Sequence, residues 1–153
     1  MRTALVTDAI TRDHSKAMAT CVEPDPVARL RRIAAEATLL QDDAAELLDE
    51  IAARGPLAEL ASRGGRITTR FVTLAEELPA SADPLLRRYC EVLHCVFDHH
   101  AMLIASALDL LAVDWRSEAM VEQLGRIGGL GPPAEWLEAI RAQLEDRYAD
   151  TTA

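Results

Sequence analysis

The sequence predicts an all-α protein: a helical bundle of five or six helices around a long central buried helix at about residues 84–113. Half of the 153 residues are hydrophobic, and most of these are Ala, Leu, Ile and Val, whereas only 4% of the chain is aromatic. Alanine and leucine are strong helix formers, while aromatic and β-branched residues are enriched in strands. In addition, two long segments carry apolar residues at alternating spacings of three and four, and each opens with an Asp-Pro pair that favours a helix start.

The length of the chain fits one domain with a sizeable core. We expect residues 25–150 to form this single α-helical domain. Residues 1–24 are more polar and irregular, and we expect them to form an N-terminal arm that is partly helical or packs on the rest of the protein or on a partner.

The first long helix begins at Asp25-Pro26, where Asp caps the helix and Pro occupies its first position. Its apolar positions form an unbroken heptad seam, a pattern typical of a helix that packs along another long helix. We expect the helix to end near Arg54-Gly55, with the glycine as the stop signal. The seam consists of Leu30, Ile33, Ala37, Leu40, Ala44, Leu47 and Ile51.

Two shorter helices are expected next. One covers residues 56–62 and is closed by Gly64-Gly65, because adjacent glycines disfavour a helix. The other runs from about Arg66 to Leu78 and ends at Pro79. Its threonines have β propensity, but its apolar residues repeat with the period of a helix, and we give periodicity the greater weight.

The second long helix begins at Asp83-Pro84 and is predicted to run to about Val113, a length of roughly 45 Å. Apolar residues also occupy its other faces, among them Phe97, Ile104 and Met102. A helix that is apolar nearly all round is typical of a buried position, so we expect the other helices to surround it. Its seam consists of Leu86, Tyr89, Leu93, Val96, His100, Leu103, Ala107 and Leu110.

The C-terminal part of the chain predicts two more helices. The first covers residues 116–127 and is stopped by a glycine-rich stretch at 128–131. The second begins at Pro132-Pro133 and places Leu137, Ile140 and Leu144 toward the core.

Composition argues against several classes of partner. The formal net charge of −9 disfavours nucleic acid, and we interpret the clusters Arg29–Arg32 and Arg87-Arg88 as solvated or paired within the chain. The most apolar stretch, 101–113, contains Asp109 and is too short to span a bilayer, so no membrane is expected. The absence of a secretory signal and of a disulfide framework predicts a cytoplasmic protein with free thiols. The strong preference for arginine over lysine is typical of a GC-rich, bacterial genome.

The candidate site is His100. On a helical wheel it lies in the middle of the apolar face of the long helix, whereas Glu91, Asp98 and Asp109 define a polar stripe. A buried imidazole must form hydrogen bonds or it destabilises the core. One interpretation is a core histidine satisfied by a backbone carbonyl, a water or a side chain such as Gln41. The other is a general acid or base in a pocket between helices.

A metal site is not expected. Glu91 and His94 match the Glu-x-x-His spacing of carboxylate-bridged di-iron bundles, and this pair is the alternative that we considered. Such a site needs a second copy of the motif, and the sequence contains none. Cys90 and Cys95 are too far apart along a helix for a disulfide bond.

Two classes of function therefore remain open. The first is a non-enzymatic binding or interaction protein that self-associates as a homodimer, because the long helices carry more apolar surface than one small monomer covers. The second is a small helical enzyme or a binder of an apolar small molecule. In that second reading, the pocket is lined by His100, Tyr89, Phe97 and Gln41. No motif implies a cofactor.

Overall fold

The computed structural model describes residues 25–113, 122 and 129–149, and each structural statement below refers to these residues. They form four helices, namely α1 (Pro26–Ala52), α2 (Leu57–Glu76), α3 (Pro84–Ala112) and α5 (Pro132–Tyr148). The protein is thus all-helical over the described residues, as the sequence predicts. The expected arm at 1–24 and the expected helix at 116–127 lie outside the described residues.

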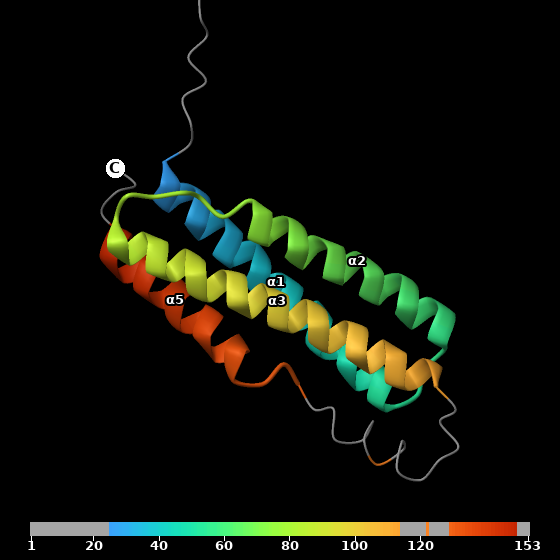
Figure 1. Ribbon diagram of the computed structural model, residues 1–153. Coiled ribbons are helices and arrows are strands. Elements are labelled where there is room, and N and C mark those ends of the chain that lie inside the picture. The colour runs from blue at the N-terminus through green and yellow to red at the C-terminus, as the bar shows by residue number, and fades with distance from the viewer. Residues whose placement is uncertain (1–24, 114–121, 123–128, 150–153) are drawn as a thin grey trace, which may run out of the picture.

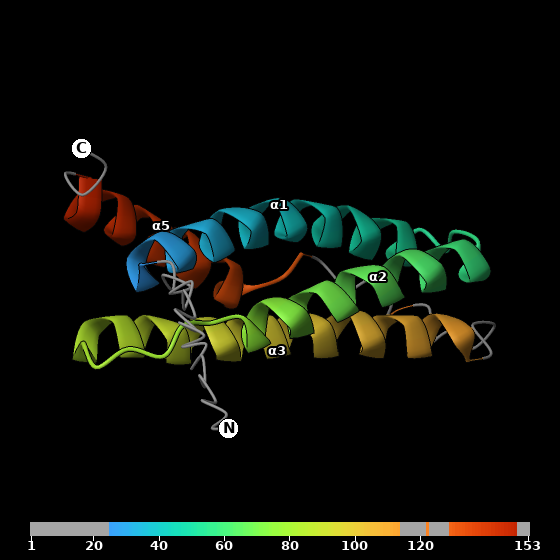
Figure 2. The same cartoon turned by 90° about the horizontal axis from the view of Figure 1, so that it is seen from above.

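The four helices pack side by side as a bundle. Figure 1 shows α3 in front of α1, with α2 and α5 on opposite sides of this pair, and Figure 2 shows the same layers from above. Accordingly, α1 and α3 each contact all three other helices, whereas α2 and α5 do not contact each other. The shorter α5 packs along only part of α3, at the end where α3 begins (Figure 1).

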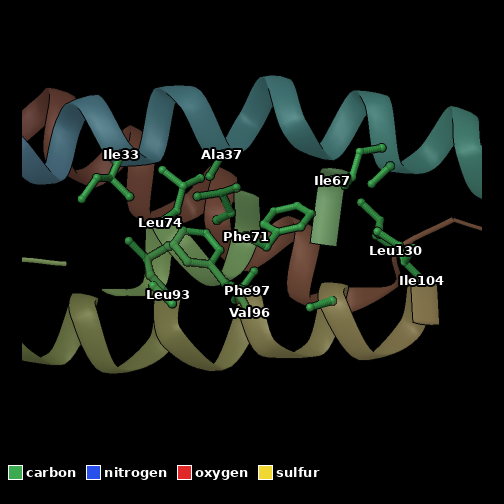
Figure 3. Packing of buried hydrophobic residues seen from close by; sticks show 14 of the residues in the cluster. Ile33, Ala37, Ile67, Phe71, Leu74, Leu93, Val96, Phe97, Ile104 and Leu130 are labelled. Atoms are coloured by element: carbon green, nitrogen blue, oxygen red, sulfur yellow. The ribbon is translucent and has the colours of Figure 1, made fainter. Parts of the chain in front are cut away.

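The core lies between the inward faces of all four helices. Figure 3 shows Ile33 and Ala37 of α1 meeting Phe71 and Leu74 of α2 above the side chains of α3. Every position of the two predicted seams is buried except three leucines, which are half-buried. This burial confirms the predicted heptad pattern. Those three residues are Leu40, Leu103 and Leu110.

Helix α1 begins where the sequence predicts, with the Asp25 carboxylate accepting a hydrogen bond from the Val27 amide at 3.4 Å. Its end differs from the prediction in one respect. The left-handed residue is Arg54, with φ of 58°, rather than Gly55. The amides of Arg54 and Gly55 donate to the carbonyls of Ile51 and Glu50, so the last carbonyls of the helix are satisfied although a residue with a side chain adopts the strained conformation.

The prediction of two short helices between 56 and 78 is wrong, because α2 runs through Gly64-Gly65 without a break. The reason lies in tertiary packing. A Cβ atom added at Gly64 would lie 2.6 Å from the Leu108 Cδ1 atom and 3.2 Å from the Ile104 Cγ2 atom of α3. Gly64 therefore permits α2 to approach α3 closely, whereas Gly65 faces open space. This merging of two helices is one reason why the described residues hold four helices instead of five or six.

Helix α3 is continuous, as predicted, and the Asp83 carboxylate caps it by accepting a hydrogen bond from the Leu85 amide at 2.8 Å. The prediction that other helices surround it is only partly right. Its inward face is buried, but its opposite face is exposed, with Met102 at 70% of full exposure, and Val113, which caps the end of the helix, is 51% exposed. By length and composition alone α3 could cross a membrane. Its exposed face, however, carries Glu91, Asp98 and Asp109, which hydrocarbon strongly disfavours.

Ion pairs on the surface join α1 to α2. Arg32 of α1 contacts Glu77 at the end of α2 at 3.0 Å, Arg70 of α2 contacts Glu36 of α1 at 2.5 Å, and Arg63 of α2 contacts Glu46 of α1 at 3.3 Å. These groups are partly exposed, so each pair contributes at most about 1 kcal/mol to stability. Arg32 is thus paired within the chain, as expected for the first arginine cluster.

The two glycines of α2 provide a matched test of this packing. We expect Gly65→Leu to raise the free energy of unfolding by up to about 1 kcal/mol, because leucine is the better helix former and a Cβ atom at this position meets nothing within 4 Å. We expect Gly64→Leu to lower it by about 1–3 kcal/mol, because the new side chain overfills the contact with α3. Urea denaturation of both variants measures the difference. Equal effects at the two positions would contradict the close approach.

Candidate functional site

The side chain of His100 is fully buried, at 0% exposure, on the inward face of α3. Its hydrogen bond and its two ring contacts involve three side chains. The Nε2 atom lies 2.7 Å from Oε1 of Gln41 on α1, and the ring centroid lies 5.2 Å from that of Phe71 on α2. The third is the exposed neighbour His99, with ring centroids 5.8 Å apart. The histidine therefore sits where three helices meet.

Gln41 is the partner that the sequence singled out, and it is itself buried at 5% exposure. Since an amide oxygen can only accept, the Nε2 atom of His100 carries the hydrogen and donates it. The Nδ1 atom is then an acceptor, and it has no hydrogen-bond partner among the described residues. One buried lone pair is thus left unsatisfied, and this lowers stability.

Burial also determines the charge of this histidine. Removal from water lowers the pKa of His100 from 6.5 to about 4, and repulsion from His99 acts in the same direction. The imidazole is therefore neutral at physiological pH. A neutral form is consistent with the geometry, because the Gln41 amide provides no negative charge to stabilise an imidazolium ion.

The remaining residues of the predicted pocket are placed differently. Phe97 packs against Phe71, with ring centroids 5.9 Å apart, and so belongs to the same part of the core as His100. Tyr89 lies about 16 Å further toward the start of α3, at ~1.5 Å per residue. Its hydroxyl donates to Gln143 on α5, with an O···O distance of 2.7 Å. The structure therefore brings His100, Gln41 and Phe97 into one cluster and leaves Tyr89 out of it.

Phe71 joins this cluster although the sequence analysis did not select it as a site residue. Phe71 belongs to the apolar repeat of Ile67, Phe71, Leu74 and Leu78, whose spacing predicts the inward side of a helix, and it is buried there. Which residue of α3 it meets depends on how α2 and α3 are aligned, and the spacing within one helix does not contain that information.

A surface groove with a volume of about 660 Å³ lies away from His100. It runs between the end of α2, the connection at 78–81 and the first half of α3. Its floor is mainly apolar, and the half-buried Cys90 thiol lies 3.5 Å from the Pro79 carbonyl oxygen. Burial raises the pKa of this thiol, which keeps it protonated. The groove is lined by Ala75, Leu78, Pro79, Ala80, Ser81, Arg87, Cys90, Glu91, His94 and Cys95.

Glu91 and His94, the alternative metal pair, both lie at this groove. The Nδ1 atom of His94 is 3.1 Å from an Asp98 carboxylate oxygen, and both side chains are more than half exposed. Among the described residues, no three His, Cys, Asp or Glu side chains gather in a way that could hold a metal ion. A carboxylate–imidazole pair on an exposed helix face is a common surface contact.

The geometry thus determines what the histidine can do chemically. A general acid or base must come within hydrogen-bond reach of its substrate. His100 is instead enclosed by Gln41, Phe71 and the core, and the large groove lies elsewhere. In this conformation the histidine links α3 to α1 through Gln41 and has no contact with solvent. Comparison with family models, with curated proteins and with solved structures finds no match to this chain.

Replacing the pair tests its role in stability. We expect His100→Leu and Gln41→Leu each to lower the free energy of unfolding by about 1–2 kcal/mol, because each leaves the other polar group buried without its partner. The double variant should recover most of this loss, since an apolar pair needs no hydrogen bond. Urea denaturation of the wild type, the two single variants and the double variant at pH 7.5 gives the four free energies of unfolding that this comparison needs. Additive losses in the double variant would argue against a direct interaction.

Acid should destabilise the protein through the same residue. Between pH 6.5 and about 4, the unfolded chain binds a proton that folded His100 excludes, so the free energy of unfolding falls as the pH falls. At ~1.4 kcal/mol per pKa unit, the loss reaches about 3 kcal/mol near pH 4. Because carboxylates also titrate in this range, the measurement is the difference between wild type and the Gln41→Leu/His100→Leu variant across the window. Parallel curves would show that His100 binds a proton equally well in both states.

Proposed function

We propose that this chain is a non-enzymatic helical-bundle interaction protein that associates with a second copy of itself as a homodimer. The observation that carries the proposal is a set of three exposed apolar side chains, two on α3 and one at its C-cap, which lie on the same outward side as Glu91, Asp98 and Asp109. Met102 is 70% exposed and Val113 is 51% exposed, and the Cys95 side chain is also exposed. At ~100° per residue these three positions fall within about 20° of one another, so they form one line along the helix.

Single exposed apolar side chains are ordinary on protein surfaces. The apolar side chains on the outward side of α3 differ because they are aligned, among the polar residues of that side, on a helix whose opposite face already supplies a large part of the core. It extends over roughly 27 Å from Cys95 to Val113, at ~1.5 Å per residue. A second helix laid along this line would remove the exposed thioether and methyl groups from water, which favours association.

The enclosure of His100 supports a non-enzymatic role. The pKa of His100 is displaced, a property that often marks an active site. Its displaced pKa here follows from burial in the core beside Gln41 and Phe71, which is a structural cause. We therefore assign it to the stability of the bundle.

We further propose a cytoplasmic location without a membrane or nucleic-acid partner. The thiols of Cys90 and Cys95 are free, which suits a reducing compartment. Arg31 donates to the Tyr148 carbonyl at 3.3 Å and Arg88 lies 3.4 Å from Glu91, so arginines of both basic clusters are engaged within the chain. The net charge of −9 would repel a phosphate backbone.

One observation favours the second class of function, a binder of an apolar small molecule. The unsatisfied Nδ1 atom of His100 would accept a hydrogen bond from a ligand that entered the core. The test is the shift in melting temperature across a panel of apolar metabolites bearing one hydroxyl or amide group. A shift that His100→Leu abolishes would support binding, and a flat response would reject it.

Self-association is tested by sedimentation equilibrium at micromolar concentrations. We expect the wild type to sediment as a dimer and Met102→Lys to sediment as a monomer, because the variant places a charge among the exposed apolar side chains of α3. The matched control is Leu39→Lys on α1, since Leu39 is similarly exposed, at 69%, but lies on another helix. A monomeric wild type would overturn the proposal, and dissociation by both substitutions would show that α3 has no special role.

A further inference from the structure

We propose that residues 1–24 of the same chain dock in the surface groove between the end of α2 and the first half of α3, with the apolar stretch at residues 4–10 against its floor. The groove is the one beside the Cys90 thiol and the Pro79 carbonyl. Residues 1–24 precede the described residues. The inference concerns contacts within one chain, so it does not depend on the proposed self-association.

The groove has the size and the chemistry to receive a short peptide segment. Its volume of about 660 Å³ lies within the roughly 300–1,000 Å³ typical of ligand pockets. Leu78, Pro79 and their neighbours make the floor mainly apolar, and the Cys90 thiol is already engaged with the Pro79 carbonyl. The charged side chains of the lining, Arg87 and Glu91, have opposite signs. The groove therefore suits an occupant that is apolar and carries little net charge.

Other hollows on the surface suit an apolar segment less well. The hollow on the outer side of α2 is lined by Arg66, Arg70 and the hydroxyl groups of nearby serine and threonine residues. The hollow between α1 and α5 is smaller, at about 300 Å³, and three arginines line it. Covering these groups with apolar side chains would remove charges from water without a compensating partner.

The first 24 residues contain a stretch that matches the groove beside Cys90. Residues 4–10 read Ala-Leu-Val-Thr-Asp-Ala-Ile, so most of their side chains are apolar. Across residues 1–24 the basic and acidic side chains are equal in number, and the net charge of −9 therefore belongs to the rest of the chain. The rest of the chain does not repel this segment as it would repel a second copy. The balancing residues are Arg2, Arg12 and Lys16 against Asp8, Asp13 and Glu23.

The point at which this segment joins the bundle lies near the groove. Arg32, about 10 Å along α1 from Asp25, contacts Glu77 at 3.0 Å, and the next residue, Leu78, lines the groove. The start of α1 and the connection from α2 to α3 lie at the same end of the bundle in both views (Figures 1 and 2). Residues 11–24 span at most about 50 Å when extended, so residues 4–10 can reach the groove.

Covalent attachment favours this segment over other occupants. A tethered segment has an effective concentration on the order of millimolar at a site that it can reach. A contact with a dissociation constant near ~1 mM then fills the groove about half of the time. A separate molecule at micromolar concentration needs a contact about a thousandfold tighter for the same occupancy. Any such partner would also have to displace residues 1–24.

The reactivity of Cys95 tests whether the groove is covered. Its side chain lines the groove and is exposed among the described residues. In a background with Cys21→Ser and Cys90→Ser it is the single thiol. We expect Leu5→Asp combined with Ile10→Asp to speed its reaction with a maleimide by about threefold, because carboxylates disfavour the apolar floor and release the segment. Equal rates with and without these substitutions would overturn the proposal.

Two controls isolate the effect of docking. Thr3→Asp combined with Thr11→Asp adds the same charge just outside the apolar stretch and should leave the rate unchanged. A thiol moved to the exposed position 139 of α5, by Ala139→Cys with Cys95→Ser, does not line the groove and should react equally in every background. Acceleration at position 139 as well would show a general loosening of the bundle and would count against docking.

A spin label locates the stretch directly. With the three native cysteines replaced by serine, a nitroxide on Thr7→Cys should broaden the amide NMR signals of Ala80 and Glu91 and leave that of Ala107 sharp. Mixing spin-labelled protein with an unlabelled, ¹⁵N-enriched copy should give no broadening. Broadening in the mixture would show that the segment of another copy fills the groove, and broadening in neither sample would show that the groove is empty. Either result would overturn docking within one chain, whatever sedimentation shows about the dimer.

Discussion

The inward face of α3 must be covered by three helices at once, and most features of the structure follow from this requirement. A helix of 29 residues cannot bury its apolar side against one shorter partner, so α1, α2 and α5 each take a part of it. Close coverage by α2 requires the absence of a side chain at Gly64. Coverage by α1 requires a polar partner for the histidine in the middle of the apolar face, and Gln41 supplies it.

The Gln41–His100 pair reduces the freedom of the bundle to rearrange. An apolar seam alone would tolerate a shift of one helix past its neighbour by a turn, because leucine can pack on leucine in several alignments. Such a shift would separate His100 from Gln41 and leave two polar groups buried without partners. The pair therefore favours one alignment of α1 on α3, in the way that a single polar residue fixes the register of a coiled coil. The bundle loses some stability in return, because the Nδ1 atom of His100 is buried without a hydrogen-bond partner.

Much of the fold could be predicted from the sequence because it depends on local signals. The starts of α1 and α3 follow from Asp-Pro pairs, and the buried seams follow from spacing. The pairing of His100 with Gln41 was foreseen as one option, since both positions face inward. The path through Gly64-Gly65 could not be foreseen, because a glycine that ends a helix and a glycine that admits a neighbouring helix look alike in sequence. Likewise, positions seven residues apart rotate by about 20° around a straight helix, so a seam with a strict seven-residue repeat gradually leaves the buried side. Leu103 and Leu110 are therefore only half-buried, whereas Ile104 and Leu111 are buried.

The outer face of α3 also escaped prediction, because apolar residues around a helix indicate burial without saying by what. Whether Met102 is covered by the same chain or by another copy cannot be read from its own helix. The net charge of −9 restricts the possibilities, since two copies repel each other as whole molecules. At physiological ionic strength this repulsion is screened beyond about 8 Å, whereas pairs in direct contact are screened less. The proposed self-association would therefore depend on local contacts, in which burial of Met102 and Cys95 has to outweigh the desolvation of the carboxylates of Glu91, Asp98 and Asp109 on the same side of α3.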